Sequence, residues 1–412
     1  MTSKFLNHFI EKIVGAASLA YFPALLLIDN PGKLIALVLL FSIFGLLAKQ
    51  TLPKISKEER YYILSLLLFP LYVLLCLYMF EGNIRDFDNY SRFLLVIPIF
   101  FFVREYSISF NWFLIGILVA AFLYGAQTIS SNYFEINLFE FKKHLGMISL
   151  YGSIFGMICL YSTNPNRNFF TNLILYLGGI SGIMVSLIGG GRGVWIALII
   201  TAAFMFFYNP LKMKKIQKMF MPLTILALFF LSYILPSTNV ANRVNLINTA
   251  TIEYINNGKE SDINKGVSLI TRFEMIKSSI KIIKNNPWFG VGENNFKKHN
   301  ESLISNGESA TFIKKYNHPH SQVLSTMVQQ GFFGFILLVF ILYSPLGNAI
   351  YRLKNHTSHD FSYRLVISAL LIISFHFIFY GLFNAIFAHQ NMVLFYAFTT
   401  SYLMGILFRK QS

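Results

Sequence analysis

Two histidines and two arginines are the side chains of this sequence best suited to chemistry. His318 and His320 stand two residues apart in the polar run Asn317–Ser321. A neutral imidazole accepts a proton near pH 7, which makes histidine a common general base. Arg192 follows three consecutive glycines, and Arg272 stands near the start of a predicted helix. A guanidinium group beside exposed backbone N–H groups suits a phosphate. The residue types therefore indicate proton abstraction and phosphate binding.

Each of these side chains also has a purely structural explanation. A glycine hinge with an arginine that reaches toward the membrane surface explains Arg192. A neighbouring carboxylate such as Glu274 would balance the charge of Arg272, which opposes the helix dipole. His320 can be a helix cap or a polar interface residue. The pattern does not choose between His318 and His320 as the base.

Arg92 and His389 are two further polar groups next to apolar runs. Reaching toward the headgroups explains Arg92, and either residue can also line a site above the membrane. The sequence contains no P-loop, no Gly-x-Ser-x-Gly turn and no metal-spaced cluster of histidines and cysteines. Cys76 and Cys159 both lie in apolar runs, where they form neither a disulfide framework nor a metal site alone. We predict no metal site and no cofactor.

The composition places these residues in a polytopic membrane protein. Of 412 residues, 55% are hydrophobic and 13% are charged. Apolar runs of roughly 15 to 23 residues recur along the chain, and about 20 are needed to cross the hydrocarbon as a helix. The net charge of +16 comes from basic residues between these runs, where they orient helices and meet anionic headgroups rather than nucleic acid. The predicted fold is an all-α bundle.

Twelve apolar runs are candidates for membrane-spanning helices. They cover residues 13–28, 34–48, 61–80, 92–103, 110–128, 145–162, 171–188, 193–208, 220–236, 332–346, 365–387 and 390–408. With both termini in the cytoplasm, twelve spans place the basic loops inside and one large polar block outside, as the positive-inside rule requires. We therefore predict spans 1 to 9 in residues 1–236, a periplasmic block in 237–330 and spans 10 to 12 in 331–412.

The first predicted helix of the outer block carries Arg272. Thr271–Glu274 has the spacing of a capping box, and Pro287 follows the end of the helix. Its apolar positions recur at helical intervals and are Phe273, Ile276, Ile280 and Ile283. Flanking lysines make this helix suitable for the surface of the outer leaflet and its phosphate-bearing lipids. Packing against the other spans is an equal alternative.

The second predicted helix of the block starts near Pro319, because proline is favoured in the first turn of a helix. It ends at Gly331, where the next span begins. His320 would then lie in the first turn, where the positive end of the helix dipole keeps its imidazole neutral.

Taken together, these motifs resemble those of the bacterial O-antigen ligases, within the wider superfamily of O-antigen ligases and polymerases. The matching segments are Ser91–Leu95 with Ile97–Pro98, Arg192–Trp195, Arg272 with Pro287–Gly292, and His320–Ser321 with Gly331 and Gly334. Twelve spans with one large outer loop before the last three also resemble this family of GT-C-like membrane glycosyltransferases. The sequence departs from the family pattern at Gly191, where serine is frequent, and at Ile276, where an aromatic residue is frequent.

The resemblance implies transfer of a polysaccharide from an undecaprenyl-diphosphate carrier to a sugar hydroxyl of the lipid A-core. Arg192 and Arg272 would hold the diphosphate, and His320 would deprotonate the acceptor hydroxyl. The carrier already supplies an activated leaving group, so neither metal nor nucleotide is implied, and in-line attack would invert the anomeric centre. The implied location is the inner membrane of a Gram-negative bacterium, with the site facing the periplasm and in contact with membrane lipids.

Three other functions stay open. An O-antigen polymerase uses the same carrier but tends to have two sizeable outer loops, whereas the preceding outer loop here, 130–144, is short. A protein O-oligosaccharyltransferase would use a hydroxyl on a protein. A transporter or flippase for lipid-linked glycans would need a hydrophilic path, for which the uncharged interiors of the predicted spans give little material.

Overall fold

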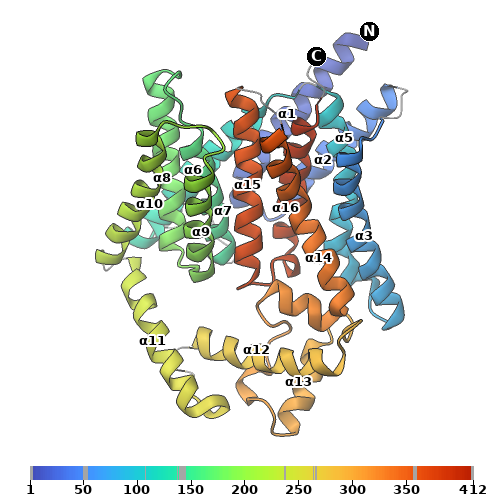
Figure 1. Ribbon diagram of the computed structural model, residues 1–412, viewed down its shortest axis with the longest axis vertical. Helices are drawn as coiled ribbons and strands as arrows, with labels where there is room; N and C mark the ends of the chain where they lie inside the picture. Colours follow the sequence, from blue (N-terminus) through green and yellow to red (C-terminus); the bar gives the residue numbers. More distant parts are fainter. Residues whose placement is uncertain are drawn as a thin grey trace.

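The structure is a computed structural model that describes residues 3–49, 54–106, 108–136, 138, 145–235, 238–262, 264, 267–355 and 360–409. Within these ranges every regular element is a helix (Figure 1). The predicted all-α class is therefore confirmed for the described part of the chain. The predicted boundary at residues 236 and 237 lies outside it, as do Lys410 and most of the second half of the predicted loop 130–144.

The helices form a bundle and an outer block. The bundle contains α1 (Ser3–Leu27), α2 (Gly32–Ala48), α3 (Lys57–Met79), α4 (Asp88–Leu95), α5 (Ile97–Glu105), α6 (Phe110–Tyr133), α7 (Leu145–Tyr161), α8 (Phe169–Ile188), α9 (Arg192–Tyr208), α10 (Lys215–Ile234), α14 (Gln322–Asn355), α15 (Phe361–Gly381) and α16 (Gln390–Leu407). The outer block contains α11 (Val240–Asn257), α12 (Val267–Asn285) and α13 (Phe296–Ser305). The connections include the short 3-10 helices η1 (Ile84–Phe87), η3 (Gly258–Glu260), η5 (Thr311–Ile313) and η6 (Ile386–Ala388).

Seven helices of the described chain are long and apolar enough to cross a membrane. Three shorter apolar helices, α2, α7 and α9, lie among them. Large apolar side chains face outward along the bundle; examples on α3 are Leu64, Leu68, Leu71 and Leu75. An apolar outer surface of this kind matches lipid rather than water. The chain is thus a polytopic membrane protein, and the number of twelve spans stays a prediction.

The predicted span 92–103 is wrong as a single helix. In the structure α4 ends at Leu95, Val96 turns the chain, and α5 begins at Ile97. Pro98 in the first turn of α5 explains the break, because it lacks an N–H and its ring would clash with the carbonyl four residues earlier. The polar residues of α4 consequently form a separate short element before α5.

Helices α7 and α8 of the bundle approach each other unusually closely. A Cβ on Gly182 of α8 would lie 2.6 Å from the carbonyl oxygen of Gly152 of α7. Small residues at such a crossing allow van der Waals packing between helix backbones, which lipid does not otherwise favour. Buried aromatic rings fill the adjacent space; Tyr151 and Phe395 have centroids 4.6 Å apart. This packing holds α7, which carries part of the cavity described below, against α8 and α16.

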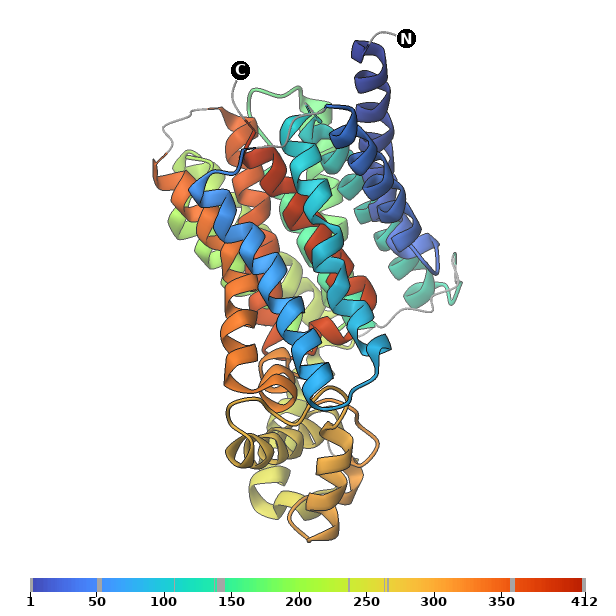
Figure 2. The ribbon, with the colours of Figure 1, turned by 90° about the vertical axis from the view of Figure 1, so that its right-hand side faces the viewer.

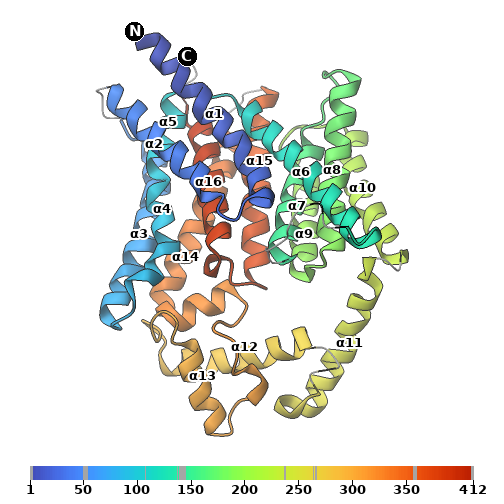
Figure 3. The ribbon, with the colours of Figure 1, turned by 180° about the vertical axis from the view of Figure 1, so that it is seen from behind.

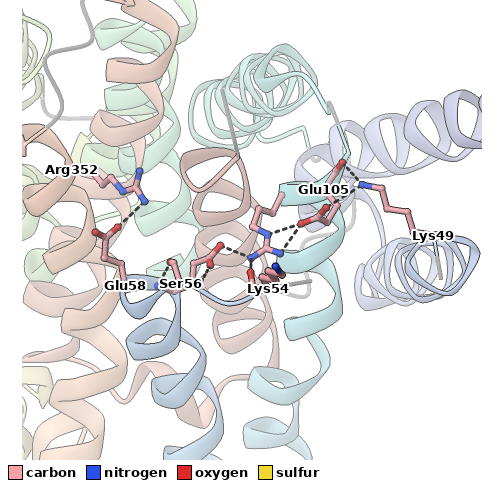
Figure 4. A network of polar contacts seen from close by, with 8 residues as sticks. Lys49, Lys54, Ser56, Glu58, Glu105 and Arg352 are labelled. Carbon is pink, nitrogen blue, oxygen red and sulfur yellow. Dashed lines mark hydrogen bonds and ion pairs between the residues drawn. The ribbon is translucent and has the colours of Figure 1, made fainter. Parts of the chain in front are cut away.

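The two chain ends and the outer block lie at opposite ends of the molecule (Figures 1 and 3). Figure 2 shows the same arrangement from the side, with α3 and α14 running next to each other. At the end that carries the termini, Arg104 pairs with Glu59 and Glu105, at 2.6 Å in each case. Arg352 of α14 pairs with Glu58 at 2.8 Å (Figure 4). These contacts tie α3, α5 and α14 together at the end where the sequence predicts basic cytoplasmic loops.

Helix α12 crosses the outer block and begins earlier than predicted. Its first residue is Val267, four residues before Thr271, so the predicted capping box at Thr271–Glu274 is wrong. Glu274 is fully buried. Its carboxylate accepts hydrogen bonds from Tyr254 Oη (2.6 Å) and from the backbone N–H of Ala310 (3.0 Å). A buried carboxylate requires such donors, so long-range contacts rather than capping decide the position of Glu274.

The exposed face of α12 is apolar in part. Met275 and Ile282 pack inside the block, whereas Ile276 and Ile280 of the predicted stripe are exposed. Lys277 stands next to this exposed pair and is itself half exposed. An exposed apolar stripe beside lysines is what a helix on a membrane surface requires, which favours the surface alternative for these two positions.

Helix α14 breaks at Gly331, as predicted. Gly331 has φ 68° and ψ −163°, a conformation that essentially only glycine adopts. The break lets residues 287–292 pair with the α14 backbone: Val291 N donates to Val328 O (2.8 Å) and Phe332 N donates to Pro287 O (2.8 Å). The outer block is therefore joined to a membrane helix by main-chain hydrogen bonds.

The start of α14 differs from the prediction. The helix begins at Gln322 rather than near Pro319, and Ser321 Oγ accepts a hydrogen bond from Leu324 N (3.4 Å). His320 has φ 49°, in the left-handed region, so it precedes the helix and does not lie in its first turn. The Ser321 cap explains the difference, because a hydroxyl that accepts an N–H of the first turn defines a helix start.

Candidate functional site

A cavity of about 830 Å³ lies where the outer block meets the bundle. Its walls come from six parts of the chain: the start of α7, the α8–α9 turn, the outer-block helices α11 and α12, the loop before α14, and the α15–α16 connection. The predicted residues that line it are Arg192, Arg272, His318, His320 and His389. The fold thus brings together side chains that are up to 197 residues apart in the sequence (192 to 389).

Three guanidinium groups line this cavity, which we call the arginine cavity. They belong to Arg192, Arg243 and Arg272, and the charges of Arg243 and Arg272 act unfavourably on that of Arg192. Among the described residues no carboxylate lines the cavity, and none of the three arginines forms an ion pair there. Glu274, the suggested partner of Arg272, uses its carboxylate within the outer block instead. The cavity therefore holds like charges that an anionic ligand would balance.

The α8–α9 turn positions Arg192. Gly190 has φ 69°, and Gly191 precedes Arg192, the first residue of α9. Trp195 Nε1 donates to Ser186 O at 3.1 Å and ties the turn to α8. The free backbone N–H groups at a helix start are electropositive. Arg192 adds a full charge to the same end of α9.

Arg243 was not among the predicted site residues. It lies in the first turn of α11, and its Nη1 donates to Gly190 O at 2.5 Å. A Cβ on Gly190 would overlap this guanidinium group, so the glycine provides the space that Arg243 occupies. No local motif marks Arg243, because only the docking of α11 brings it to the turn.

Arg272 is the sixth residue of α12 and not, as predicted, part of its first turn. The hydrogen bonds that Glu274 accepts from Tyr254 and Ala310 hold this part of α12 in place. Burial lowers the pKa of Arg272 from its usual range, although Tyr380 and Tyr316 partly oppose this effect. A charge that burial disfavours gains most from an anionic partner.

Three imidazole rings gather beside the arginines. The His318 ring centroid lies 4.6 Å from that of His320 and 6.3 Å from that of His389. His320 N donates to His318 Nδ1 at 3.3 Å. Burial, together with the charge of His320, lowers the pKa of His318 to about 4, so His318 is neutral near pH 7. With Nδ1 accepting, the ring proton of neutral His318 is on Nε2.

The buried glutamine Gln322 fixes the two histidine-bearing segments relative to each other. Its Oε1 accepts from Phe387 N (2.8 Å), and its Nε2 donates to Thr326 Oγ1 (3.0 Å). The start of α14, two residues after His320, is thereby tied to the connection that carries His389. The histidine cluster consequently depends on contacts between distant segments.

Asn384 and Tyr380 also line the arginine cavity and were missed. Both were expected inside the span 365–387, but α15 ends at Gly381. Asn384 Nδ2 donates to Tyr380 Oη, and its Oδ1 has no hydrogen-bond partner among the described residues. The polar Asn384 in an otherwise apolar run was the signal for an earlier helix end.

Arg92 does not line the arginine cavity. It is 7% exposed, pairs with Asp88 at 3.0 Å and also donates to the Asp88 carbonyl. Its guanidinium therefore stabilises α4. Throughout the described residues, no group of three or more His, Cys, Asp or Glu side chains is placed to hold a metal ion.

These features define a helical membrane protein with a strongly basic cavity at one end of its bundle. Residues 177–339 match the profile of the family described as O-Antigen ligase. This segment contains Arg192, Arg243, Arg272 and both histidines of the loop before α14. The match confirms the resemblance predicted from the motifs and supports membership of the O-antigen ligase superfamily.

A second similarity covers most of the chain. An uncharacterized protein of Haemophilus influenzae is 24% identical over 350 residues, which cover 83% of this chain and 84% of that protein. The similarity thus extends well beyond the family match, across most of the bundle.

Proposed function

We propose that this protein is an O-antigen ligase. It transfers a polysaccharide from undecaprenyl diphosphate to a sugar hydroxyl of the lipid A-core, at the periplasmic face of the inner membrane and with both termini in the cytoplasm. The observation that carries the proposal is the arginine cavity, in which three arginines without carboxylate partners in the described chain stand next to a histidine cluster. It belongs to a chain whose residues 177–339 match the ligase family.

The arginines act on the leaving group. As the bond between the anomeric carbon and the phosphate oxygen breaks, negative charge grows on the departing undecaprenyl diphosphate. Guanidinium groups held in a partly buried cavity stabilise that charge without reorganising. Arg192 is the first residue of α9. The free N–H groups at this helix start stabilise the same negative charge.

His320 acts on the nucleophile. The acceptor hydroxyl oxygen attacks the anomeric carbon, and His320 takes the hydroxyl proton as the new C–O bond forms. His318 is less suited to this role, because its Nδ1 already accepts the His320 N–H and its Nε2 carries the proton. A neutral His318 instead offers a hydrogen-bond donor. Attack opposite to the leaving group inverts the anomeric centre.

The decisive experiment for the function is gel analysis of lipopolysaccharide from cells that lack this protein. We expect bare lipid A-core in the deletion strain, accumulation of polymerised glycan on its carrier, restoration by the intact protein and no restoration by Arg272→Ala at equal expression. Arg167→Ala is the matched control, since Arg167 lies between α7 and α8, away from the cavity, and should restore fully. Cores that carry a single repeat would show that chain growth had failed, and would identify a polymerase instead.

Arg243→Ala should weaken donor binding in a purified system. Loss of one charge-assisted contact to a diphosphate costs about 1.5–3 kcal/mol, so we expect the KM for the carrier-linked glycan to rise about tenfold or more. Gly190→Ala should act in the same direction, because its Cβ would displace the Arg243 guanidinium. Initial rates at varied donor concentration provide the measurement. An unchanged donor KM in both variants would remove Arg243 from the diphosphate site.

A further inference from the structure

A second cavity adjoins the arginine cavity and has the opposite chemistry. Its volume is about 320 Å³, and it lies between η1 and α4, residues 293–294, the start of α14 and the α15–α16 connection. His318 lines both cavities, so this residue forms a shared wall. The two spaces therefore meet at the histidine cluster, where the proposed transfer takes place.

Carboxylates and amides line the second cavity. The acidic residues are Asp86, Asp88 and Glu293, and Arg85 is the one arginine among the described residues of its lining. The arginine cavity, by contrast, has three arginines and, in the same described chain, no carboxylate in its lining. A phosphate group is attracted to the first cavity and repelled by the second. Carboxylates and amides are the groups that accept hydrogen bonds from hydroxyls.

Two polar side chains of this cavity form no hydrogen bond with the part of the chain that the structure describes. Ser325 is 4% exposed, and its Oγ has no hydrogen bond among the described residues. Gln329 is 8% exposed and lines the same cavity; its side-chain amide is not fully enclosed and forms no hydrogen bond with the described residues. Both lie on the face of α14 that borders the cavity. Buried polar groups are normally paired, and leaving them unpaired is unfavourable, so the buried hydroxyl of Ser325 points to a polar ligand. Gln329 offers such a ligand a further hydrogen-bonding group.

Glu293 adds a group that exchanges a proton in the physiological range. Burial raises its pKa to about 7, against the effect of the hydrogen bond from Gln330 Nε2 (2.5 Å). Asp86 raises it further, and Tyr90 lowers it. A half-protonated carboxyl both donates and accepts, which suits a polyhydroxyl ligand that does the same.

The size restricts the ligand to a small group. Ligand cavities commonly measure about 300–1,000 Å³, so 320 Å³ suits a single sugar ring rather than a chain. Because His318 lines this cavity, a sugar ring bound in it would have a hydroxyl close to the histidine cluster.

We propose that this second cavity, the acceptor pocket, binds the terminal, non-phosphorylated sugar of the acceptor, on the evidence of its acidic lining, its unpartnered Ser325 and Gln329 and its shared wall at His318. The inference rests on the proposed function and adds to it the class of acceptor sugar and the residues that select it. His318 is a positioning residue in this arrangement, because its Nε2–H can donate a hydrogen bond to an oxygen of the acceptor sugar. Because Arg92 pairs with Asp88, the repulsion that excludes phosphorylated sugars comes mainly from Asp86 and from the ionised fraction of Glu293.

Steady-state kinetics of the purified full chain test the pocket. The assay uses carrier-linked glycan as donor and lipid A-core as acceptor, each varied in turn. For the double variant Ser325→Ala with Gln329→Ala we expect the acceptor KM to rise at least tenfold, with the donor KM within twofold of the intact protein. For Arg272→Ala we expect the reverse: the donor KM rises at least tenfold, and the acceptor KM stays within twofold of the intact protein. Gln217→Ala, on α10 and outside both cavities, should change neither constant.

A binding measurement provides a readout besides turnover. Core oligosaccharide released from lipid A should bind the intact chain and lose at least tenfold in affinity with the double variant, at an unchanged melting temperature. A core phosphorylated on its terminal sugar should bind more weakly to the intact chain, and Asp86→Asn should reduce that discrimination.

Failure of the ligase function and failure of the acceptor pocket give different results. Absence of any transfer by the intact protein would overturn the ligase function. Normal transfer with an unchanged acceptor KM and unchanged oligosaccharide binding in the double variant would overturn the acceptor pocket alone. Equal affinity of the intact chain for phosphorylated and non-phosphorylated cores would refute the proposed charge selection.

Discussion

Replacement of His320 by alanine should lower the rate of glycan transfer by about 10²–10⁴-fold, the usual contribution of a general base. The loss should appear in kcat, because the imidazole takes the hydroxyl proton while the new bond forms and contributes less to binding of the donor. His320 precedes α14 and lies outside its hydrogen-bonded turns, so we expect the variant to insert and fold. Single-turnover rates with saturating donor and acceptor would measure the effect.

His299→Ala is the matched control for this prediction. His299 lies on α13 and outside both the arginine cavity and the acceptor pocket, so its loss should leave kcat unchanged. His318→Ala should mainly raise the acceptor KM, because we assign that ring a positioning role. A His320→Ala protein that transfers glycan at the normal rate would show that another group accepts the proton.

Replacement of Gly331 by alanine should detach the outer block from the bundle. A Cβ at this position would overlap the carbonyl group of Trp288, which cannot move without breaking the main-chain pairing. The φ of 68° and ψ of −163° add backbone strain of about 1–3 kcal/mol for a residue other than glycine. Since Gly290 meets the α14 backbone equally closely, Gly290→Ala should have a similar effect. We expect a melting temperature many degrees lower, rapid proteolysis within 238–330 and loss of transfer.

Gly307→Ala separates the two causes of this destabilisation. Gly307 also has a positive φ of 70°, but a Cβ added there would meet no atom of the described chain within 4 Å, so this variant places alanine at a positive φ without the clash. A small decrease in melting temperature is expected, with transfer retained. If Gly331→Ala and Gly307→Ala melted at the same temperature, the close approach at residues 287–292 would not be what holds the block.

Local patterns predicted the parts of the site that depend on local structure. Arg192 follows a glycine turn between two apolar runs, and that turn is where the structure places it. The break at Gly331 was likewise predicted, since a glycine between two helical patterns marks a change of direction. His318 and His320 were predicted as site residues because they stand in the polar run Asn317–Ser321, shortly before the tenth predicted span.

Long-range contacts decided what local patterns could not. The spacing Thr271–Glu274 predicts a capping box, yet the Glu274 carboxylate accepts hydrogen bonds from Tyr254 Oη and Ala310 N instead. His320 was expected in a helix turn, but the Ser321 cap and the tie of Gln322 to Phe387 start the helix after it. A hydroxyl or carboxylate with several possible partners takes the one that the packed chain presents, and sequence spacing does not specify that choice.

The sequence by itself determined the helical membrane class, the positions of most helices and the resemblance to the O-antigen ligase superfamily, because hydrophobicity and periodicity act over single segments and motif residues stand at recognisable spacings. Only the tertiary structure decided that Arg243 joins Arg192 and Arg272, that Arg92 pairs with Asp88 instead of lining the cavity, and that an acidic pocket meets the basic one at His318. These outcomes depend on how separate segments dock, and the energies of docking come from contacts between residues far apart in the chain.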